Sequence, residues 1–373
     1  MRRQERAAGE SAWPDLPPEL LDRIIGALSP VDRVAVRLVC ASWRACVRES
    51  FPSDLPFEVP RLLIRRPSGH GGELAFFSLR DRRILPFRLP DRLRAGRCCG
   101  HVGGWLVMAF DSDRSRGIVA CNPVSGRSVD IPSPPVFPVS KMVLSGPPTS
   151  RGSWVAAALG RGGTIALFHP AVSSSWMTIG IEEGERRGGF RDMAFWRGGL
   201  CALGYDGAVL AFRADLGARA ATVSVLREAG PQPPPQVEVG VLMYLVESEG
   251  ELMLVRKLYR SLREVDLDVE VRLLVSPPEK RRWDLLAETP GVALFVGAVV
   301  STAVPVALYN ASASGSGFQI RDSCVYFARR EVEMMTPHAI CEYSLLDEQI
   351  KGVPVAGGHD VHVDPVWITP VVR

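Results

Sequence analysis

The feature that most constrains the fold is a long series of short apolar runs separated by turn-forming residues, which begins at Arg61 and continues almost to the end of the chain. The runs have the length of β-strands and lack the three-to-four-residue spacing of a helix face. Three of the intervening stretches, Arg161-Gly162-Gly163, Tyr205-Asp206-Gly207 and Ser248-Glu249-Gly250, are typical of hairpin turns. The expected strands are Leu74–Leu79, Trp105–Ala109, Ile118–Cys121, Trp154–Leu159, Thr164–Phe168, Met193–Trp196, Leu200–Leu203, Ala208–Arg213, Val241–Val246, Glu251–Lys257, Val269–Val275, Cys324–Phe327 and Ala339–Tyr343.

A series of this length predicts a closed all-β architecture. The chain has 373 residues, among them 35 Gly and 30 Pro, and a single β-sandwich would be unusually long. Blades of about 40 to 50 residues each fit a β-propeller with six or seven blades. The fold class expected is therefore mainly β.

One segment resembles a membrane span. No charged residue occurs between Thr289 and Ile320, and Gly291–Tyr309 approaches the length needed to cross a bilayer. Pro305 interrupts it, and no basic cluster flanks it. We favour two buried strands, Val292–Val296 and Val304–Tyr309.

The amino-terminal stretch Trp13–Glu49 has a different pattern, that of three short helices. Two prolines suit the start of the first helix, and Ser29-Pro30-Val31-Asp32 suits the start of a second. Trp43 lies on a third. So few residues cannot bury all their apolar side chains in one another, and Leu16, Leu20 and Trp43 are expected to form a surface that binds another protein.

Charge and cysteine content narrow the functional classes. The net charge of +3 is too small to indicate a nucleic-acid partner, and we expect none. Eight cysteines show no regular framework, which favours thiols in a reducing compartment. The first residues lack the apolar core of a secretory signal. We therefore expect a cytoplasmic or nuclear protein that does not span a membrane.

Motifs for catalysis and metal binding are sparse. Gly160–Thr164 is rich in glycine but lacks the lysine and the following helix of a P-loop. In the cluster His359–Asp364, the side chains of Asp360, His362 and Asp364 would share one face of an extended strand and could hold a cation, although a polar loop entering the last strand is the simpler interpretation. We therefore predict no catalytic residue, no metal and no cofactor.

The order of residue types in the amino-terminal stretch resembles an F-box. The matching residues are Leu16, Pro17, Glu19, Leu20, Leu21, Asp32, Arg37, Val39, Cys40, Trp43 and Arg44. The resemblance implies a domain at residues 13–50 that docks on a Skp1-like adaptor and, through it, on a cullin. The adaptor-binding residues that it implies are Leu16, Pro17, Leu20, Leu21, Ile24, Leu28, Asp32, Val39, Cys40, Trp43 and Arg44. An ordinary helical hairpin that caps a larger domain is the alternative.

A second resemblance extends over nearly the whole chain, to the KIB-type β-propeller domain of plant F-box proteins. It rests on Phe76–Leu79, Arg97–Gly100, Gly104–Val107, Asn122–Gly126, Ile131-Pro132, Tyr244–Ser248, Gly250–Leu252, Ala293–Gly297, Cys324–Phe327 and Trp367–Pro370. It implies a propeller at residues 61–373, joined to the F-box by a proline-rich linker at residues 51–60. The sequence departs from the pattern around Val299–Pro305, where a more polar strand is expected.

Together these observations predict a non-catalytic subunit that recruits a target protein to an SCF-type (Skp1–cullin–F-box) ubiquitin ligase. Two alternatives stay open: a propeller scaffold whose helices only cap the domain, and an enzyme built on the propeller channel. The sequence does not identify the residues that bind the target. If Leu16, Leu20 and Trp43 were sealed beneath the propeller, the ligase interpretation would be wrong.

Overall fold

The computed structural model describes most of the chain from residue 16 onward. The described residues are 16–27, 42–43, 46, 60–66, 73–79, 83–86, 89–112, 115–123, 125–148, 154–172, 174–179, 189–214, 223–228, 240–259, 267–275, 282–311, 318–328, 340–353 and 362–368. Of the predicted linker at residues 51–60, only Pro60 is included.

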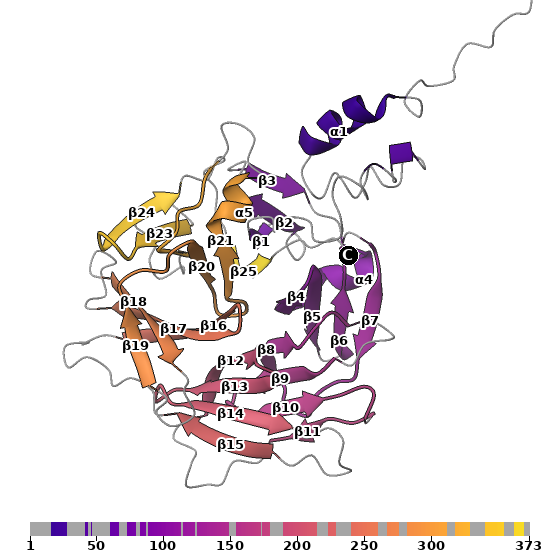
Figure 1. Cartoon of the computed structure of the whole chain (residues 1–373). Coiled ribbons are helices and arrows are strands. Elements are labelled where there is room, and N and C mark those ends of the chain that lie inside the picture. The colour runs from indigo at the N-terminus through magenta and orange to yellow at the C-terminus, as the bar shows by residue number, and fades with distance from the viewer. Residues whose placement is uncertain are drawn as a thin grey trace, which may run out of the picture.

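The described strands form six sheets arranged as a ring around a central channel (Figure 1). This confirms the predicted β-propeller and sets the number of blades at six. Blade 1 contains β25 (His362–Ile368), β1 (Arg61–Arg66), β2 (Glu73–Ser78) and β3 (Arg83–Pro86). Blade 2 contains β4 (Arg97–Val102), β5 (Trp105–Ser112), β6 (Ser115–Cys121) and β7 (Ser128–Ile131). Blade 3 contains β8 (Val139–Leu144), β9 (Ala156–Gly160), β10 (Ile165–Phe168) and β11 (Met177–Thr178).

Blades 4 and 5 are also four-stranded, and blade 6 has five strands. Blade 4 contains β12 (Phe190–Trp196), β13 (Gly199–Gly204), β14 (Val209–Ala214) and β15 (Val223–Glu228). Blade 5 contains β16 (Gly240–Ser248), β17 (Glu251–Tyr259), β18 (Leu267–Val275) and β19 (Arg282–Leu286). Blade 6 contains β21 (Thr302–Pro305), β20 (Val292–Val296), β22 (Cys324–Ala328), β23 (Ile340–Ser344) and β24 (Gln349–Val353). Contacts run from β25 to β4, from β4 to β8, from β8 to β12, from β12 to β16 and from β16 to β21. These edge strands therefore form the inner ring.

The apolar runs are continuous because the middle strands are buried on both faces. In β9, Ala156 and Ala158 face the core between blades 2 and 3, whereas Ala157 and Leu159 face the core between blades 3 and 4. Successive side chains of a strand point to opposite faces, so each blade contributes to two cores. Six such clusters, one for each pair of neighbouring blades, hold the described ring together.

The two ends of the propeller close the ring by pairing with each other. β25, near the carboxyl terminus, is antiparallel to β1, with Trp367 opposite Leu62. The Trp367 side chain is fully buried, donates its indole N–H to the Val296 carbonyl of blade 6 at 2.9 Å and meets the Phe295 ring edge-on at 5.0 Å. One residue therefore joins blade 1 to blade 6.

The predicted strand Val304–Tyr309 is wrong. β21 ends at Pro305, and α5 (Val306–Ala311) follows. The reason lies in the position of the next strand: β21 and β22 lie on opposite sides of β20, and β22 is parallel to β20, so the chain must cross over from one side of β20 to the other. The helix begins that crossover, and Tyr309 anchors it with a hydrogen bond to the Phe318 carbonyl at 2.7 Å. None of the described helices is long and apolar enough to cross a bilayer.

Candidate functional sites: the amino-terminal helix and the channel cavity

The amino-terminal helix α1 (Pro18–Ala27) begins as the sequence predicts. The carbonyl of Pro17 accepts hydrogen bonds from the N–H groups of Leu20 and Leu21 at 3.0 and 3.1 Å. Pro18 occupies the first turn, where its missing N–H costs nothing, and Glu19 adds a negative charge near the positive end of the helix dipole.

Apolar side chains lie on two sides of α1. Leu21 and Ile25, one turn apart, form a small core with Trp43, against which Leu16, Ile24 and Cys46 also pack. Leu20 points elsewhere and is 45% exposed. The described part of this segment therefore separates an internal core from an outward apolar side chain.

This arrangement divides the predicted adaptor-binding residues into groups. Leu21 and Trp43 are buried, so in the free chain they support the exposed face from behind rather than form it. Pro17 and Leu20 are exposed, and Leu16 and Ile24 are half-buried. The remaining ones lie outside the described residues: Leu28, Asp32, Val39, Cys40 and Arg44.

The described amino-terminal residues are not sealed beneath the propeller. Figure 1 shows α1 outside the ring of sheets. Among the described residues, only those of the amino-terminal segment contribute to the core around Trp43. Of the three predicted helices, the first is α1, and the third is represented by the helical residues Ser42, Trp43 and Cys46. The predicted second helix lies outside the described residues.

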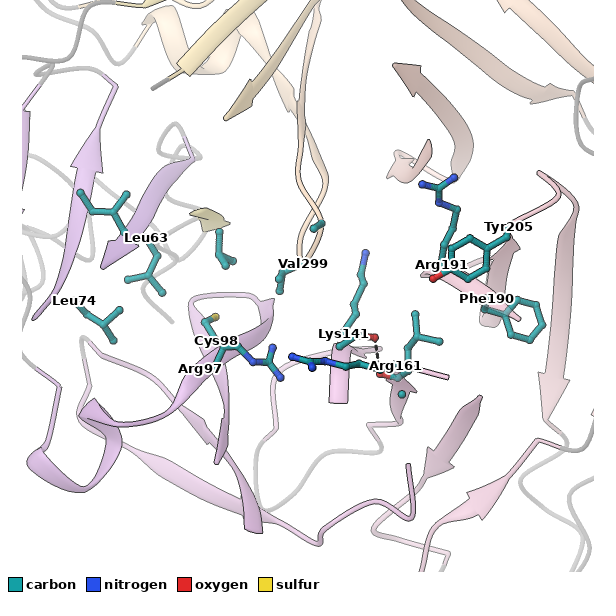
Figure 2. A pocket seen from close by; sticks show the side chains of 16 residues that line it. Leu63, Leu74, Arg97, Cys98, Lys141, Arg161, Phe190, Arg191, Tyr205 and Val299 are labelled. Atoms are coloured by element: carbon teal, nitrogen blue, oxygen red, sulfur yellow. Dashed lines mark hydrogen bonds between the residues drawn. The ribbon is translucent and has the colours of Figure 1, made fainter. Parts of the chain in front are cut away.

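A cavity of about 320 Å³ opens at the end of the channel where the inner strands begin. Sixteen residues line it (Figure 2). They come from the first residues of β4, β8 and β12, from the end of β9 and the turn after it, from the β13–β14 turn, from the connection between β20 and β21, and from blade 1. A second cavity of similar volume lies toward the other end of the same strands. Val299 and Lys141 line both cavities and therefore lie between them.

Val299 belongs to a short connection that projects into the channel. We call residues 297–301, between β20 and β21, the channel plug. Ser301 Oγ lies 3.3 Å from both the Gly297 N–H and the Gly297 carbonyl, which closes the plug on itself. In Figure 2 the tip bearing Val299 reaches between the residues of blade 1 and those of blades 3 and 4. The plug therefore separates the channel into its two cavities.

An ion pair at the cavity floor connects three blades. Lys141 on β8 and Asp192 on β12 are almost completely buried and form a salt bridge. The second carboxylate oxygen of Asp192 accepts the N–H of Leu245 on β16 at 2.8 Å. A buried charge of this kind is tolerated only when it is paired and hydrogen-bonded. The pair therefore fixes the relative positions of blades 3, 4 and 5.

Two arginines at the cavity bind the backbone of the next blade. Arg97, the first residue of β4, donates to the carbonyl of Val139 on β8. Arg191 on β12 donates to the carbonyl of Val241 on β16 at 3.0 Å. Arg191 is the extra residue of a bulge in β12, and bulges redirect side chains. The same kind of hydrogen bond, from blade 2 to blade 3 and from blade 4 to blade 5, holds both guanidinium groups at the channel.

The cavity also contains a thiol, that of Cys98. Burial raises the pKa of this thiol to about 12, so it is protonated at neutral pH, and only the thiolate form is a strong nucleophile. The described residues contain no group of three or more His, Cys, Asp or Glu side chains placed to hold a metal ion. The side chains of the suggested cation ligands Asp360, His362 and Asp364, and of their neighbour His359, lie outside the described part.

Sequence reasoning did not identify the channel residues as a site. Arg97 was named only for the family resemblance, Cys98 for that resemblance and as one of the eight cysteines, and Arg191 not at all. A signal was present: a basic residue recurs near the start of successive inner strands, at Arg97, Lys141 and Arg191. Its meaning depends on which strands line the channel, and sequence spacing alone does not show that.

Family models match both parts of the chain. An F-box-like model matches residues 13–51, and a KIB1-4 β-propeller model matches residues 76–352. No curated protein gives a significant match.

Similarity to solved structures is weak. The N-terminal domain of Nup159 aligns with 11% identity and a TM-score of 0.31, over 52% of this chain and 48% of that one. BBS1N from its complex with ARL6DN aligns with 11% identity and a TM-score of 0.37, over 76% and 75%. A candidate 6-phosphogluconolactonase from Bacteroides fragilis aligns with 14% identity and a TM-score of 0.40, over 82% and 84%. TM-scores below 0.5 support no further conclusion.

The family match rests on the propeller, whose six described blades, closed by pairing of β25 with β1, agree with it. The F-box-like segment precedes the propeller, and its described helix lies outside the ring (Figure 1). The two together fit the architecture of an F-box substrate receptor. The chain belongs to the KIB1-4 β-propeller family.

Proposed function

We propose that this chain recruits target proteins to an SCF-type ubiquitin ligase. The F-box-like segment docks on a Skp1-like adaptor, which connects the chain to a cullin, and the propeller binds the target. The observation that carries this proposal is the combination of the F-box-like match with an apolar helix face that the described propeller residues leave uncovered.

Docking on the adaptor uses the outward side of α1. Leu20 is the exposed apolar anchor of that side, and the half-buried Leu16 and Ile24 extend the surface. Helix faces commonly bind in this way, with a few apolar anchors supplying most of the affinity. Leu21, Ile25 and Trp43 contribute by keeping the helical segment folded. Leu28, Asp32, Val39, Cys40 and Arg44 complete the proposed surface.

The chain carries out no catalytic step in this proposal. It raises the effective concentration of target lysines near the ubiquitin-transferring subunits, which is a matter of proximity. It requires no cofactor, nucleic acid or membrane. We place the activity in the cytoplasm or the nucleus, because the irregular spacing of the eight cysteines is typical of thiols in a reducing compartment.

Co-expression with a Skp1-like adaptor, followed by affinity capture of the complex, tests the proposal. Leu20→Asp places a charge in the proposed contact and is expected to weaken adaptor capture by at least about tenfold, because a buried apolar anchor is worth about 2 kcal/mol. Leu346→Asp is the matched control, since Leu346 is also an exposed leucine (65%) but lies between β23 and β24 on the propeller.

The result also distinguishes the alternative function, a propeller scaffold whose helices only cap the domain. In that case the wild-type chain captures no adaptor, and Leu20→Asp behaves like Leu346→Asp. Adaptor capture that survives Leu20→Asp undiminished would refute the proposed contact even if a complex forms.

A further inference from the structure

The residues that line the first cavity, at the end of the channel where the inner strands begin, carry an excess of positive charge. Four of the sixteen are basic (Arg97, Lys141, Arg161 and Arg191), and none of the sixteen is Asp or Glu. Lys141 is balanced by Asp192 just behind the lining. The three arginines come from blades 2, 3 and 4, which lie next to one another in the ring. One side of the cavity is therefore a basic wall.

Two of these arginines face each other. Figure 2 shows the side chains of Arg97 and Arg161 pointing toward one another across the basic wall. Their anchors agree with this view: the guanidinium of Arg97 donates to the carbonyl of Val139, and the backbone N–H of Arg161 donates to the carbonyl of Pro138 at 3.1 Å. Like charges that converge in a cavity repel one another, and an anion between them removes that repulsion.

The guanidinium groups are held in advance of any ligand. Hydrogen bonds to Val139 and Val241 position Arg97 and Arg191, and each such bond takes one of the five N–H donors of an arginine. The guanidinium fork matches the oxygen geometry of a phosphoryl group. Groups positioned before binding lose less entropy when a ligand arrives.

The opposite wall of the cavity is apolar. Leu63, Leu74 and Val366 of blade 1 line it, together with Val299 of the channel plug. Tyr205 stands at the basic wall, 53% exposed, with its ring 5.5 Å from the Arg191 guanidinium carbon. A ligand that fits both walls has an anionic group next to an apolar one.

We propose that this cavity binds a phosphorylated side chain of the target protein, with the neighbouring apolar residue of the target against blade 1. The inference rests on the proposed function and names the chemistry of the target. The cavity volume of about 320 Å³ lies at the lower end of the range for small-ligand sites. It therefore has room for only a short, extended segment of the target. Several arginines favour a phosphoryl dianion over a single carboxylate.

The test measures binding of the full-length chain to two fluorescent peptide libraries. Both have randomised flanking positions around one fixed residue, which is phosphoserine in one library and serine in the other. We expect the phosphoserine library to bind at least about tenfold more tightly, with an affinity that falls as salt is added, because each charge-assisted hydrogen bond contributes strongly. Equal binding of the two libraries would overturn the proposal.

Arg161→Glu is the informative variant. The Arg161 side chain is exposed, so the change spares the core. We expect it to reduce phosphoserine binding about tenfold or more, whereas Arg127→Glu, an exposed arginine outside the cavity, leaves binding unchanged. An undiminished affinity in Arg161→Glu overturns the site.

Two further measurements separate the possible sources of phosphate and the two proposals. Inorganic phosphate and inositol hexakisphosphate are used as competitors. If either competitor displaces the phosphoserine library and binds as tightly as the library does, the assignment of the cavity to a target segment is overturned. Adaptor capture by Arg161→Glu is expected to equal that of the wild type. If the wild-type chain captures the adaptor but binds the phosphoserine and serine libraries equally, this inference alone is refuted. If the wild-type chain fails to capture the adaptor but still prefers the phosphoserine library, the proposed function alone is refuted.

Discussion

Removing the carboxylate of Asp192 is expected to destabilise the propeller more than most single changes. The Lys141 and Asp192 side chains are 5% and 4% exposed, so Asp192→Ala leaves the Lys141 ammonium buried without its counter-ion. The N–H of Leu245, which bonds to the same carboxylate at 2.8 Å, also loses its acceptor. Breaking a buried pair by removing one partner costs about 3–5 kcal/mol, a large part of the roughly 5–15 kcal/mol that stabilises a folded domain.

A double-mutant comparison tests the physical reason. Asp192→Asn retains an oxygen for the Leu245 N–H but not the charge. Adding Lys141→Met removes the buried cation as well. The double variant is expected to be more stable than Asp192→Ala, because no unpaired charge is left in the interior.

Urea denaturation followed by tryptophan fluorescence gives the free energies of unfolding. The matched control is Asp284→Ala, which breaks the Arg282–Asp284 pair, whose Nε–Oδ1 distance is 2.7 Å and whose side chains are 70% and 38% exposed. A surface pair is worth about 0–1 kcal/mol, so its loss should hardly move the midpoint. If Asp192→Ala is no more destabilising than Asp284→Ala, the buried pair does not connect the blades as described.

Two other changes test the inner ring. Gly100→Ala would place a Cβ 2.1 Å from the Met142 carbonyl oxygen of the next inner strand, so we expect the free energy of unfolding to fall by about 1–3 kcal/mol. Gly117→Ala is the control, because nothing lies within 4 Å of its added Cβ and the change should be close to neutral. Equal denaturation midpoints for the two variants would contradict the tight approach of β4 to β8. Burial raises the pKa of the Cys98 thiol from 9.0 to about 12, so the unfolded chain loses this proton first as the pH rises. The free energy of unfolding should therefore fall from about pH 9 toward pH 12, by up to about 1.4 kcal/mol per pH unit from this one group. Denaturation curves of Cys98→Ala at several pH values should show a smaller fall per pH unit. An equal fall in the variant and the wild type would show that Cys98 is not its source.

Local sequence predicted the strands of the middle of each blade well. The predicted Val292–Val296 coincides with β20, and the predicted Trp154–Leu159 overlaps β9 (Ala156–Gly160) with a shift at the ends. These runs are recognisable because a strand between two neighbouring blades must be apolar on both faces. The turns were equally visible, since their geometry requires glycine: Gly163 and Gly207 both have a positive φ.

The errors occurred where a distant partner decides the conformation. Val306–Ala311 has strand-forming composition but is the helix α5, because the chain must cross from β21 on one side of β20 to β22 on the other. Trp43 was expected on the outer surface, yet it packs on Leu21 and Ile25. An amphipathic pattern shows that a residue is apolar but does not show which of two apolar surfaces it covers.

The sequence by itself therefore determined the class of the molecule: a helical F-box-like segment followed by a ring of short strands, because alternation, turn residues and helix starts are local properties. The number of blades, the closure of the ring by Trp367 and the convergence of Arg97, Arg161 and Arg191 on one cavity were decided only by the tertiary structure. The physical reason is that these features depend on contacts between residues far apart in the chain. Such contacts follow from which strands become neighbours around the channel, and no local pattern encodes that.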